Sequence, residues 1–272
     1  MFEGTLEITT TLLPKGCSVA CRICPQELLV SQYADETRKM SFESFVKILS
    51  KVPKSYRIDF SGYAEPFLNR ECSKMMLHAH KSGYKIACYT TLVGVSEEDL
   101  DVLASIPFGV ENPLHIHVPD KNGVMPIKIT TKYKSILQSF INRRIPHSSY
   151  MTMDPGGSPH PEIEPLVRGL LGRFTQVSRA GNVEESVEIR KRGRLRCDPM
   201  PRMNHNVLLP NGDVQLCCQD YGLKHTLGNL NEVGHDELFK GDEFARVLRE
   251  MSSSDYNDSD ILCRTCEYAK QC

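Results

Sequence analysis

The chain carries near its N-terminus the stretch Cys17-Ser18-Val19-Ala20-Cys21-Arg22-Ile23-Cys24, in which three cysteines follow the spacing C-x3-C-x2-C. It comes directly after an apolar, strand-like run over residues 5–13. Three cysteines this close cannot all pair as disulfides, because the short loops strain the bond and one thiol is left over. Three thiolates can instead hold three corners of a cubane iron–sulfur cluster and leave the fourth metal open. A structural zinc site would usually take four protein ligands.

A second group of cysteines lies in the last third of the chain. Cys197 is followed by fourteen residues, Gly212, four residues and Cys217, and the stretch 263–266 with Cys272 follows later. The chain has 11 cysteines in 272 residues. Residues 1–13 do not show the charged segment and apolar stretch of a signal peptide, and no run approaches the ~18 apolar residues of a membrane span. We therefore expect a protein of the reducing cytoplasm whose cysteines bind metal rather than form disulfides.

Composition limits the remaining possibilities. A formal net charge of −1 argues against a general nucleic-acid-binding protein. At 272 residues and 40% hydrophobic content, the chain can bury a core and form one large domain with a small one. Cys72 and Cys88 lie outside both cysteine groups and are expected to be buried structural thiols.

Residues 5–181 alternate between β-prone runs and helical patterns. Strands are expected at residues 5–13, 56–60, 85–91, 113–118, 149–154 and 174–178. Helices are expected at residues 41–52, 71–82, 96–104, 131–144 and 161–171. Strand–helix units with short connections imply an α/β fold, a parallel sheet that curls into a partial (β/α)6 TIM-like barrel with helices outside. Sites in such folds gather at the C-terminal ends of strands, which is where the first cysteine loop lies.

The pattern changes after Gly181, so we expect a first domain over residues 1–181 and a second over 182–272. Residues 206–209 and 214–217 flank a Pro-Asn-Gly-Asp turn and predict a β-hairpin, and residues 236–251 predict a helix. A segment this small buries a thin core, which a metal cluster can hold together.

These motifs together resemble those of the radical SAM enzymes over nearly the whole chain. Cys17, Cys21 and Cys24 resemble the cluster motif of that superfamily, and residues 61–66 resemble its Gly-Glu segment, which binds the amino group of S-adenosylmethionine (SAM). The Cys-x14-Gly-x4-Cys hairpin, residues 227–230 and the final Cys-x2-Cys resemble its SPASM and twitch domains. In size and layout the chain is similar to 2-deoxy-scyllo-inosamine dehydrogenase-like enzymes.

The resemblance implies two 4Fe-4S clusters and bound SAM. The first cluster would take Cys17, Cys21 and Cys24, and an auxiliary cluster would take Cys197, Cys217, Cys263 and Cys266, with Cys272 as a replacement ligand or a vestige. The residues implied to contact SAM are Ile23, Gly62, Tyr63, Ala64, Glu65, Thr90, Thr91 and His117. Ile23 stands where the family often has an aromatic residue, and Ala64 where glycine is common. His117 shares one side of its strand with His115, and a core or rim histidine is the alternative reading.

The implied function is reductive cleavage of SAM to a 5′-deoxyadenosyl radical, which abstracts hydrogen from a small polar substrate such as a carbohydrate or cyclitol. Oxidation or epimerisation at a hydroxyl-bearing carbon would follow. Arg179 is expected to contact the reacting hydroxyl, with an interdomain ion pair as the alternative. In an epimerase, Cys218 or Cys272 is expected to donate the hydrogen atom. A flavodoxin- or ferredoxin-type protein would supply electrons, with neither membrane nor nucleic acid as partner. The alternatives are modification of a peptide or protein, and a non-catalytic protein stapled by metal.

Overall fold

A nine-stranded sheet organises the part of the chain that the computed structural model describes, which is residues 3–154, 156–167, 171–172, 178–183 and 190–272. The order of the strands is β10-β9-β8-β1-β2-β3-β4-β5-β6, and the neighbours from β1 to β6 all pair in parallel. The strands are β1 (Gly4–Ile8), β2 (Tyr56–Phe60), β3 (Ile86–Thr90), β4 (Leu114–His117), β5 (Ser149–Met151), β6 (Leu171–Gly172), β8 (His205–Leu208), β9 (Asp213–Gln215) and β10 (Thr226–Asn229).

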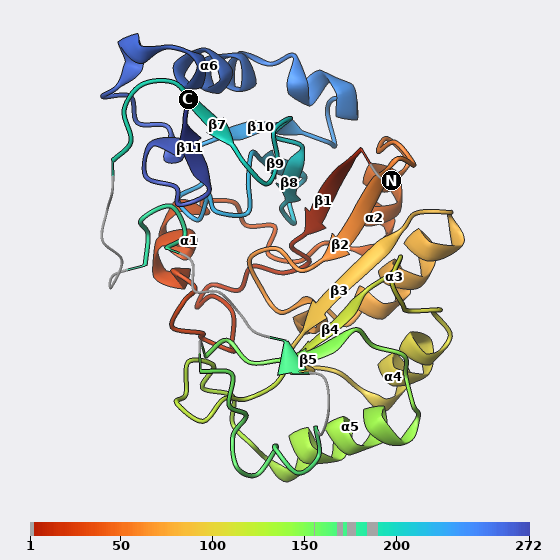
Figure 1. The fold of residues 1–272 in the computed structure, drawn as a ribbon. Helices are drawn as coiled ribbons and strands as arrows, with labels where there is room; N and C mark the ends of the chain where they lie inside the picture. The colour runs from red at the N-terminus through yellow and green to blue at the C-terminus, as the bar shows by residue number, and fades with distance from the viewer. Residues whose placement is uncertain (1–2, 155, 168–170, 173–177, 184–189) are drawn as a thin grey trace.

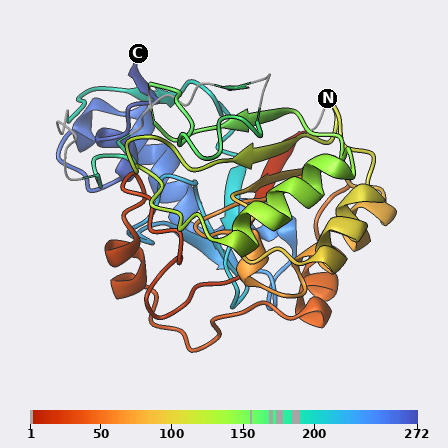
Figure 2. The same cartoon turned by 90° about the horizontal axis from the view of Figure 1, so that it is seen from below.

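Four helices follow one side of these strands (Figure 1; Figure 2 shows the row from below). They are α2 (Phe42–Leu49), α3 (Cys72–Lys81), α4 (Glu97–Ala104) and α5 (Thr131–Asn142). Ser41 caps α2, and Ser96 forms a capping box with Asp99 at the start of α4. The alternation of strands and helices confirms the expected α/β fold of a partial, open barrel.

The two faces of the parallel strands differ in chemistry because successive side chains point to opposite sides. The side chains that pack under the helices include Leu6, Ile8, Ile58, Phe60, Ile86, Cys88, Leu114 and Ile116. The residues on the opposite face, inside the open barrel, include Glu7, Arg57, Asp59, Tyr89 and His117. Cys72 and Cys88 are fully buried in the helix-side core, which confirms the expected burial of these thiols.

Two expected elements after β5 differ from the structure. The helix expected at residues 161–171 is wrong, because residues 161–167 form turns. Pro165 lies in the middle of that segment and cannot supply a helical N–H. The strand expected at residues 174–178 falls almost entirely on residues 173–177, outside the described part, and β6 at Leu171–Gly172 is the element that pairs with β5.

The expected hairpin is confirmed and joins the barrel sheet. β8 pairs antiparallel with β9 on one side and parallel with β1 on the other, so that Thr5 lies opposite His205. Gly212 in the hairpin turn has a φ of +96°, and a Cβ there would lie 2.2 Å from Asn231 Nδ2. The segment after residue 181 therefore extends the first sheet instead of folding apart from it.

The rest of the C-terminal segment surrounds this hairpin. β7 (Leu195–Cys197) pairs antiparallel with β11 (Ala269–Gln271). The helix expected at residues 236–251 is in fact two, a 3-10 helix η2 (His235–Phe239) and α6 (Asp242–Ser252), because Gly241 between them is extended and caps α6. The remaining short helices are α1 (Gln26–Gln32), η1 (Pro66–Leu68), η3 (Ser254–Tyr256) and η4 (Leu262–Arg264). None of the helices in the described part is long and apolar enough to cross a membrane.

Candidate functional site

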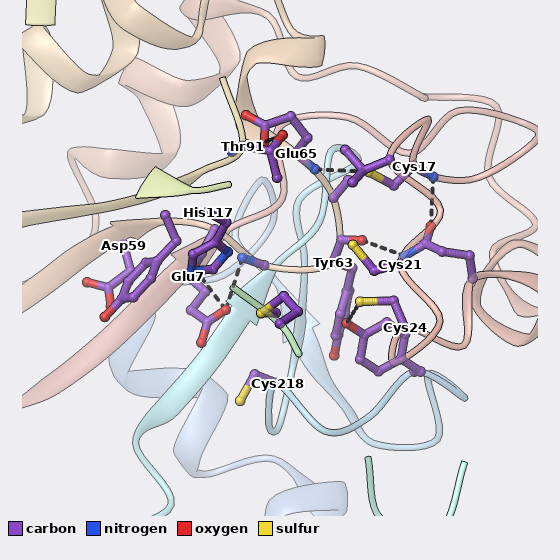
Figure 3. Close-up of a pocket in the computed structure, with 18 of the residues that line it drawn as sticks. Glu7, Cys17, Cys21, Cys24, Asp59, Tyr63, Glu65, Thr91, His117 and Cys218 are labelled. Carbon is purple, nitrogen blue, oxygen red and sulfur yellow. Dashed lines mark hydrogen bonds between the residues drawn. The ribbon is translucent and has the colours of Figure 1, made fainter. Parts of the chain in front are cut away.

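A cavity of about 270 Å³ lies on the inner face of the barrel strands (Figure 3). Its wall combines the N-terminal cysteine loop, the segment after β2, the ends of β3 and β4, and residues from the C-terminal third. It is lined by Glu7, Cys17, Val19, Cys21, Cys24, Gln26, Arg57, Asp59, Ser61, Gly62, Tyr63, Ala64, Glu65, Tyr89, Thr91, His117, Met125, Met153, Arg179, His205, Cys218 and Tyr221.

The three N-terminal cysteines line this cavity together, so the structure brings together the thiols that the spacing predicted. The Cys17 N–H donates a hydrogen bond to Gln26 Oε1 over 2.8 Å, and Gln26 Nε2 donates to the Tyr63 carbonyl oxygen over 2.8 Å. Gln26 thus ties the cysteine loop to the segment after β2. Three thiols on one cavity wall fit a cluster with one open corner.

The segment after β2 bends tightly past β1. Gly62 has a φ of +69°, and a Cβ there would lie 2.2 Å from Thr9 Oγ1, so glycine is required. The turn aims the Glu65 N–H at Cys17 Sγ, 3.4 Å away. Ala64 lines the cavity despite standing where the resembled family often has glycine.

Thr90 and Thr91 hold the carboxylate of Glu65. Glu65 accepts hydrogen bonds from the Thr90 hydroxyl at 2.7 Å, the Thr91 hydroxyl at 2.6 Å and the Thr91 N–H at 2.7 Å. Burial raises the pKa of Glu65, and these donors oppose the rise. Thr91 lines the cavity, whereas Thr90 is 1% exposed and is not among the lining residues, so Thr90 acts on the site through Glu65.

Ile23 is buried behind the cavity wall. It packs in a small cluster with Met125 and Met153, both of which line the cavity. Ile23 itself is not among the lining residues, so its expected contact with SAM stays a prediction that the cavity lining does not support.

Two ion pairs on the inner face were not predicted from the sequence. Glu7 Oε1 and His205 Nε2 are 2.5 Å apart, and Arg57 Nε and Asp59 Oδ1 are 2.6 Å apart. Glu7 also accepts from the Ser61 hydroxyl and the Gly62 N–H, each at 3.0 Å. The signal for Glu7 was present, since a carboxylate within an apolar strand marks the inner face, but nothing local indicated His205 as its partner.

Glu7, His205 and Cys218 offer three donor atoms within 4.8 Å of one another. This set could in principle hold a metal ion. However, two atoms bound to one metal at about 2.1 Å lie about 3 Å or more apart. The 2.5 Å separation between Glu7 and His205 is instead that of a charge-assisted hydrogen bond.

His117 and His115 lie on one side of β4, as predicted from their spacing. Tyr89 stacks on the His115 ring with 4.9 Å between centroids, and its ring lies 6.2 Å from that of His117. His117 lines the cavity, and burial together with the nearby His115 lowers the pKa of His117 to about 4. His117 is therefore a neutral imidazole at physiological pH.

Arg179 and Cys218 both line the cavity, beside the cysteine loop. The Arg179 guanidinium lies 5.5 Å from the centre of the Tyr221 ring, and the Tyr221 hydroxyl donates to Cys24 Sγ over 3.6 Å. A hydrogen bond from Cys21, the charge of Arg179 and the Tyr221 hydroxyl lower the pKa of Cys24 against the effect of burial. Tyr221 was not predicted from the sequence.

The model of the SPASM family, an iron-sulfur cluster-binding domain, matches residues 197–267. The fold is similar to that of BtrN in complex with AdoMet and 2-DOIA, with 17% identity, a TM-score of 0.65, and 98% of this chain and 93% of BtrN covered.

The chain thus shares the fold of BtrN, and its residues 197–267 match the SPASM domain. Native anSMEcpe with bound AdoMet matches over 97% of this chain and 86% of its own, at 13% identity and a TM-score of 0.58. Streptococcus suis SuiB bound to precursor peptide SuiA matches over 94% of this chain and 70% of its own, at 12% identity and a TM-score of 0.51. A search of the curated proteins gave no match.

The predicted auxiliary ligands lie on elements of the C-terminal segment that pack together. β7, which ends at Cys197, pairs with β11, and Cys263 and Cys266 are buried just before β11. That these three thiols and Cys217 bind one cluster stays a prediction. Cys218, next to Cys217, instead lines the barrel cavity. The choice of Cys217 over Cys218 as the auxiliary ligand stays a prediction, because the charge of Cys218 also acts on Cys197.

Cys272 lies apart from these thiols. Ala269 pairs with Cys197, but the Cys272 N–H donates to the Arg194 carbonyl oxygen, three positions further along the strand pair. Three residues of strand span about 10 Å. Cys272 is also exposed, so the structure does not place it as a ligand beside Cys197.

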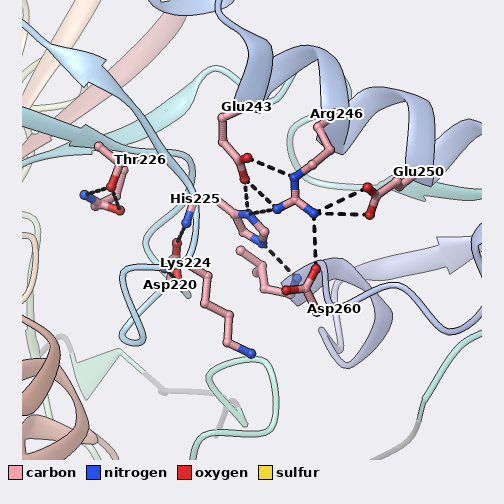
Figure 4. Close-up of polar contacts among 10 residues, drawn as sticks. Asp220, Lys224, His225, Thr226, Glu243, Arg246, Glu250 and Asp260 are labelled. Carbon is pink, nitrogen blue, oxygen red and sulfur yellow. Dashed lines mark hydrogen bonds and ion pairs between the residues drawn. The ribbon is translucent and has the colours of Figure 1, made fainter.

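A buried histidine fixes the final cysteine loop of the SPASM domain (Figure 4). His225 is 0% exposed, and its Nε2 accepts a hydrogen bond from the Leu262 N–H over 3.1 Å. That bond assigns the proton to Nδ1, which donates to Glu243 Oε1 over 2.6 Å. Arg246 pairs with the same Glu243 at 2.8 Å, so α6 and the loop before Cys263 are held by one network.

Proposed function

We propose that the protein is a radical SAM enzyme that acts on a small polar metabolite. The observation that carries the proposal is the shared cavity, where Cys17, Cys21 and Cys24 face the Gly62–Glu65 segment. A cluster on these cysteines, with SAM bound, would supply a 5′-deoxyadenosyl radical. The chain's own residues would then hold the cofactor and exclude water around the reacting carbon.

The polar lining of the barrel supports a small, hydrogen-bonding substrate. Two ion pairs lie on the inner face, Glu7 with His205 and Arg57 with Asp59. Each pair joins a negative and a positive side chain, so together they add almost no net charge to the cavity wall. Carboxylates accept from hydroxyl or amino groups, and the cations donate to hydroxyl oxygens. The likeness to BtrN in complex with 2-DOIA agrees with such a ligand.

Oxidation of a hydroxyl-bearing carbon would lose one hydrogen atom to the deoxyadenosyl group, one proton from the hydroxyl, and one electron. An auxiliary cluster in the SPASM domain is the proposed electron acceptor. Arg179 is the proposed contact to the reacting hydroxyl, because it lines the cavity and its Nε has no hydrogen-bond partner among the described residues. Epimerisation would instead return a hydrogen atom from Cys218, which faces the cavity.

Modification of a peptide is the second candidate, because SuiB bound to precursor peptide SuiA shares the fold. A flavodoxin- or ferredoxin-type donor and the cytoplasm are proposed for either function.

The test uses anaerobically reconstituted enzyme, dithionite and SAM. We expect 5′-deoxyadenosine and methionine by mass spectrometry, and their loss in Cys21→Ala; equal amounts in both proteins would rule out the proposal. A panel of cyclitols, amino sugars and short peptides, run in D2O, then separates the reactions. A ketone two mass units lighter indicates oxidation, an epimer that carries one deuterium indicates epimerisation, and a modified peptide supports the second candidate.

A further inference from the structure

Tyr221 links the SPASM domain to the N-terminal cysteine loop. It lies in the turn after β9, four residues beyond Cys217, and is 2% exposed. Its hydroxyl lies 3.6 Å from the sulfur of Cys24, which is 197 positions earlier in the chain. The hydrogen bond therefore joins a residue of the SPASM domain to the sulfur of Cys24, one of the three N-terminal cysteines expected to bind the first cluster.

The packing around Tyr221 directs its hydroxyl group to the sulfur of Cys24 as hydrogen-bond acceptor. The Tyr63 ring lies 4.7 Å from the Tyr221 ring, and Arg179 lies on it at 5.5 Å, so the side chain is fixed on two sides. Tyr63 cannot take the same role, because its hydroxyl lies 2.9 Å from the Cys217 carbonyl oxygen and 3.1 Å from that of Asp220. A buried phenol without an acceptor would cost free energy.

We propose that the Tyr221 hydroxyl, by its hydrogen bond to Cys24, raises the reduction potential of the cluster held by the N-terminal cysteines. The inference rests on the proposed function. A donor to a cysteine ligand withdraws electron density from the metals and so favours the reduced cluster, which carries one more negative charge. The positive charge of Arg179 beside Cys24 acts in the same direction. The electron itself comes from an external one-electron donor, here dithionite.

This arrangement gives the SPASM domain a role in the first site that does not depend on its own cluster. The first cluster reaches its working potential only when the turn after β9 is folded against Cys24. Tyr221 is thus a positioning and tuning residue rather than a group that touches substrate.

The test is a redox titration of reconstituted enzyme followed by electron paramagnetic resonance. The first cluster is identified by the signal that changes when SAM is added. We expect the midpoint potential of this signal to become more negative in Tyr221→Phe and to stay unchanged in Tyr256→Phe, a control on the exposed η3. The fluorinated analogue 3-fluorotyrosine at position 221 is a stronger donor of similar size and should shift the potential the other way.

The outcomes are distinct. A Tyr221→Phe protein with full iron content and the wild-type potential overturns the inference, as does an equal shift in the Tyr256→Phe control. If Tyr221→Phe loses iron, the direction of the 3-fluorotyrosine shift decides. A wild-type protein without any SAM-responsive signal removes the proposed function and the inference together, whereas a responsive signal insensitive to Tyr221 removes only the inference.

Discussion

Glu7 and His205 lie 198 positions apart in the chain, yet Oε1 of one and Nε2 of the other are 2.5 Å apart. Their pairing joins β1 to β8, the strand through which the C-terminal segment enters the barrel sheet. Burial acts to lower the pKa of His205, but the hydrogen bond and charge of Glu7 outweigh it and raise that pKa to about 9. The pair therefore contributes to the free energy of unfolding by an amount that depends on pH.

The pH dependence of stability follows from His205. Since its folded pKa of about 9 lies above the ordinary 6.5, the stabilisation is complete below pH 6.5 and is lost as the pH rises towards 9. The lost contribution is on the order of 3 kcal/mol. In urea unfolding experiments between pH 6.5 and 9, the free energy of unfolding should fall more steeply with pH for the wild type than for His205→Gln. Parallel curves would show that the pair contributes no linked proton.

The hydroxyl of Thr91 is expected to be needed for both stability and SAM binding. Thr91→Val keeps the side-chain shape but removes a donor at 2.6 Å from the buried Glu65 carboxylate. We expect a loss of about 1–3 kcal/mol in the free energy of unfolding and weaker SAM binding by equilibrium dialysis. Thr91→Ser should restore both, and a Thr91→Val protein that binds SAM normally would contradict the role given to Glu65.

Cys217 and Cys218 are neighbours that should behave differently. If two cubanes are bound, reconstituted wild-type protein should contain about eight irons and eight sulfides. Cys217→Ala should fall to about four irons, while Cys218→Ala and Cys272→Ala should keep about eight. Iron and acid-labile sulfide assays decide, and a fall in Cys218→Ala to the same level would reverse the assignment of the two thiols.

Removal of His225 should loosen the final cysteine loop. His225→Ala leaves the Leu262 N–H and the Glu243 carboxylate without their buried partner, at a cost of about 2–4 kcal/mol. We expect lower iron content at the auxiliary site, because Leu262 immediately precedes Cys263. Glu243→Gln keeps an acceptor for His225 Nδ1 and should lose much less stability and iron than His225→Ala. Equal loss in both variants would indicate that charge, not the hydrogen bonds, holds the loop.

Local sequence signals predicted the barrel elements well where caps and periodicity agree. The range 56–60 matches β2, and Ser41 and Ser96 begin their helices as expected. The helix expected at residues 161–171 does not form, because Pro165 within it cannot donate a helical hydrogen bond. The helix expected at residues 236–251 is interrupted at Gly241, whose backbone is extended.

The cysteine ligands were predictable because their spacing is short and their chemistry is specific. The ion-paired wall of the cavity was not, since the Glu7–His205 and Tyr221–Cys24 contacts depend on which strand lies next to β1. Sequence separations near 200 carry no local signal of pairing. Thr90 and Ile23 were expected to contact SAM from their motif positions, but both lie behind the residues that line the cavity. A motif position alone does not show whether a side chain reaches the cavity.

The parallel pairing of β1 with β8 affects how the chain folds during synthesis. During synthesis, one edge of β1 has no partner until residues 205–208 have left the ribosome, roughly 200 residues after β1 itself. An open strand edge can recruit other chains, and contacts this distant in sequence form slowly. Truncated or stalled products that end before β8 should therefore aggregate, and co-expressed chaperones should improve the yield of soluble full-length protein.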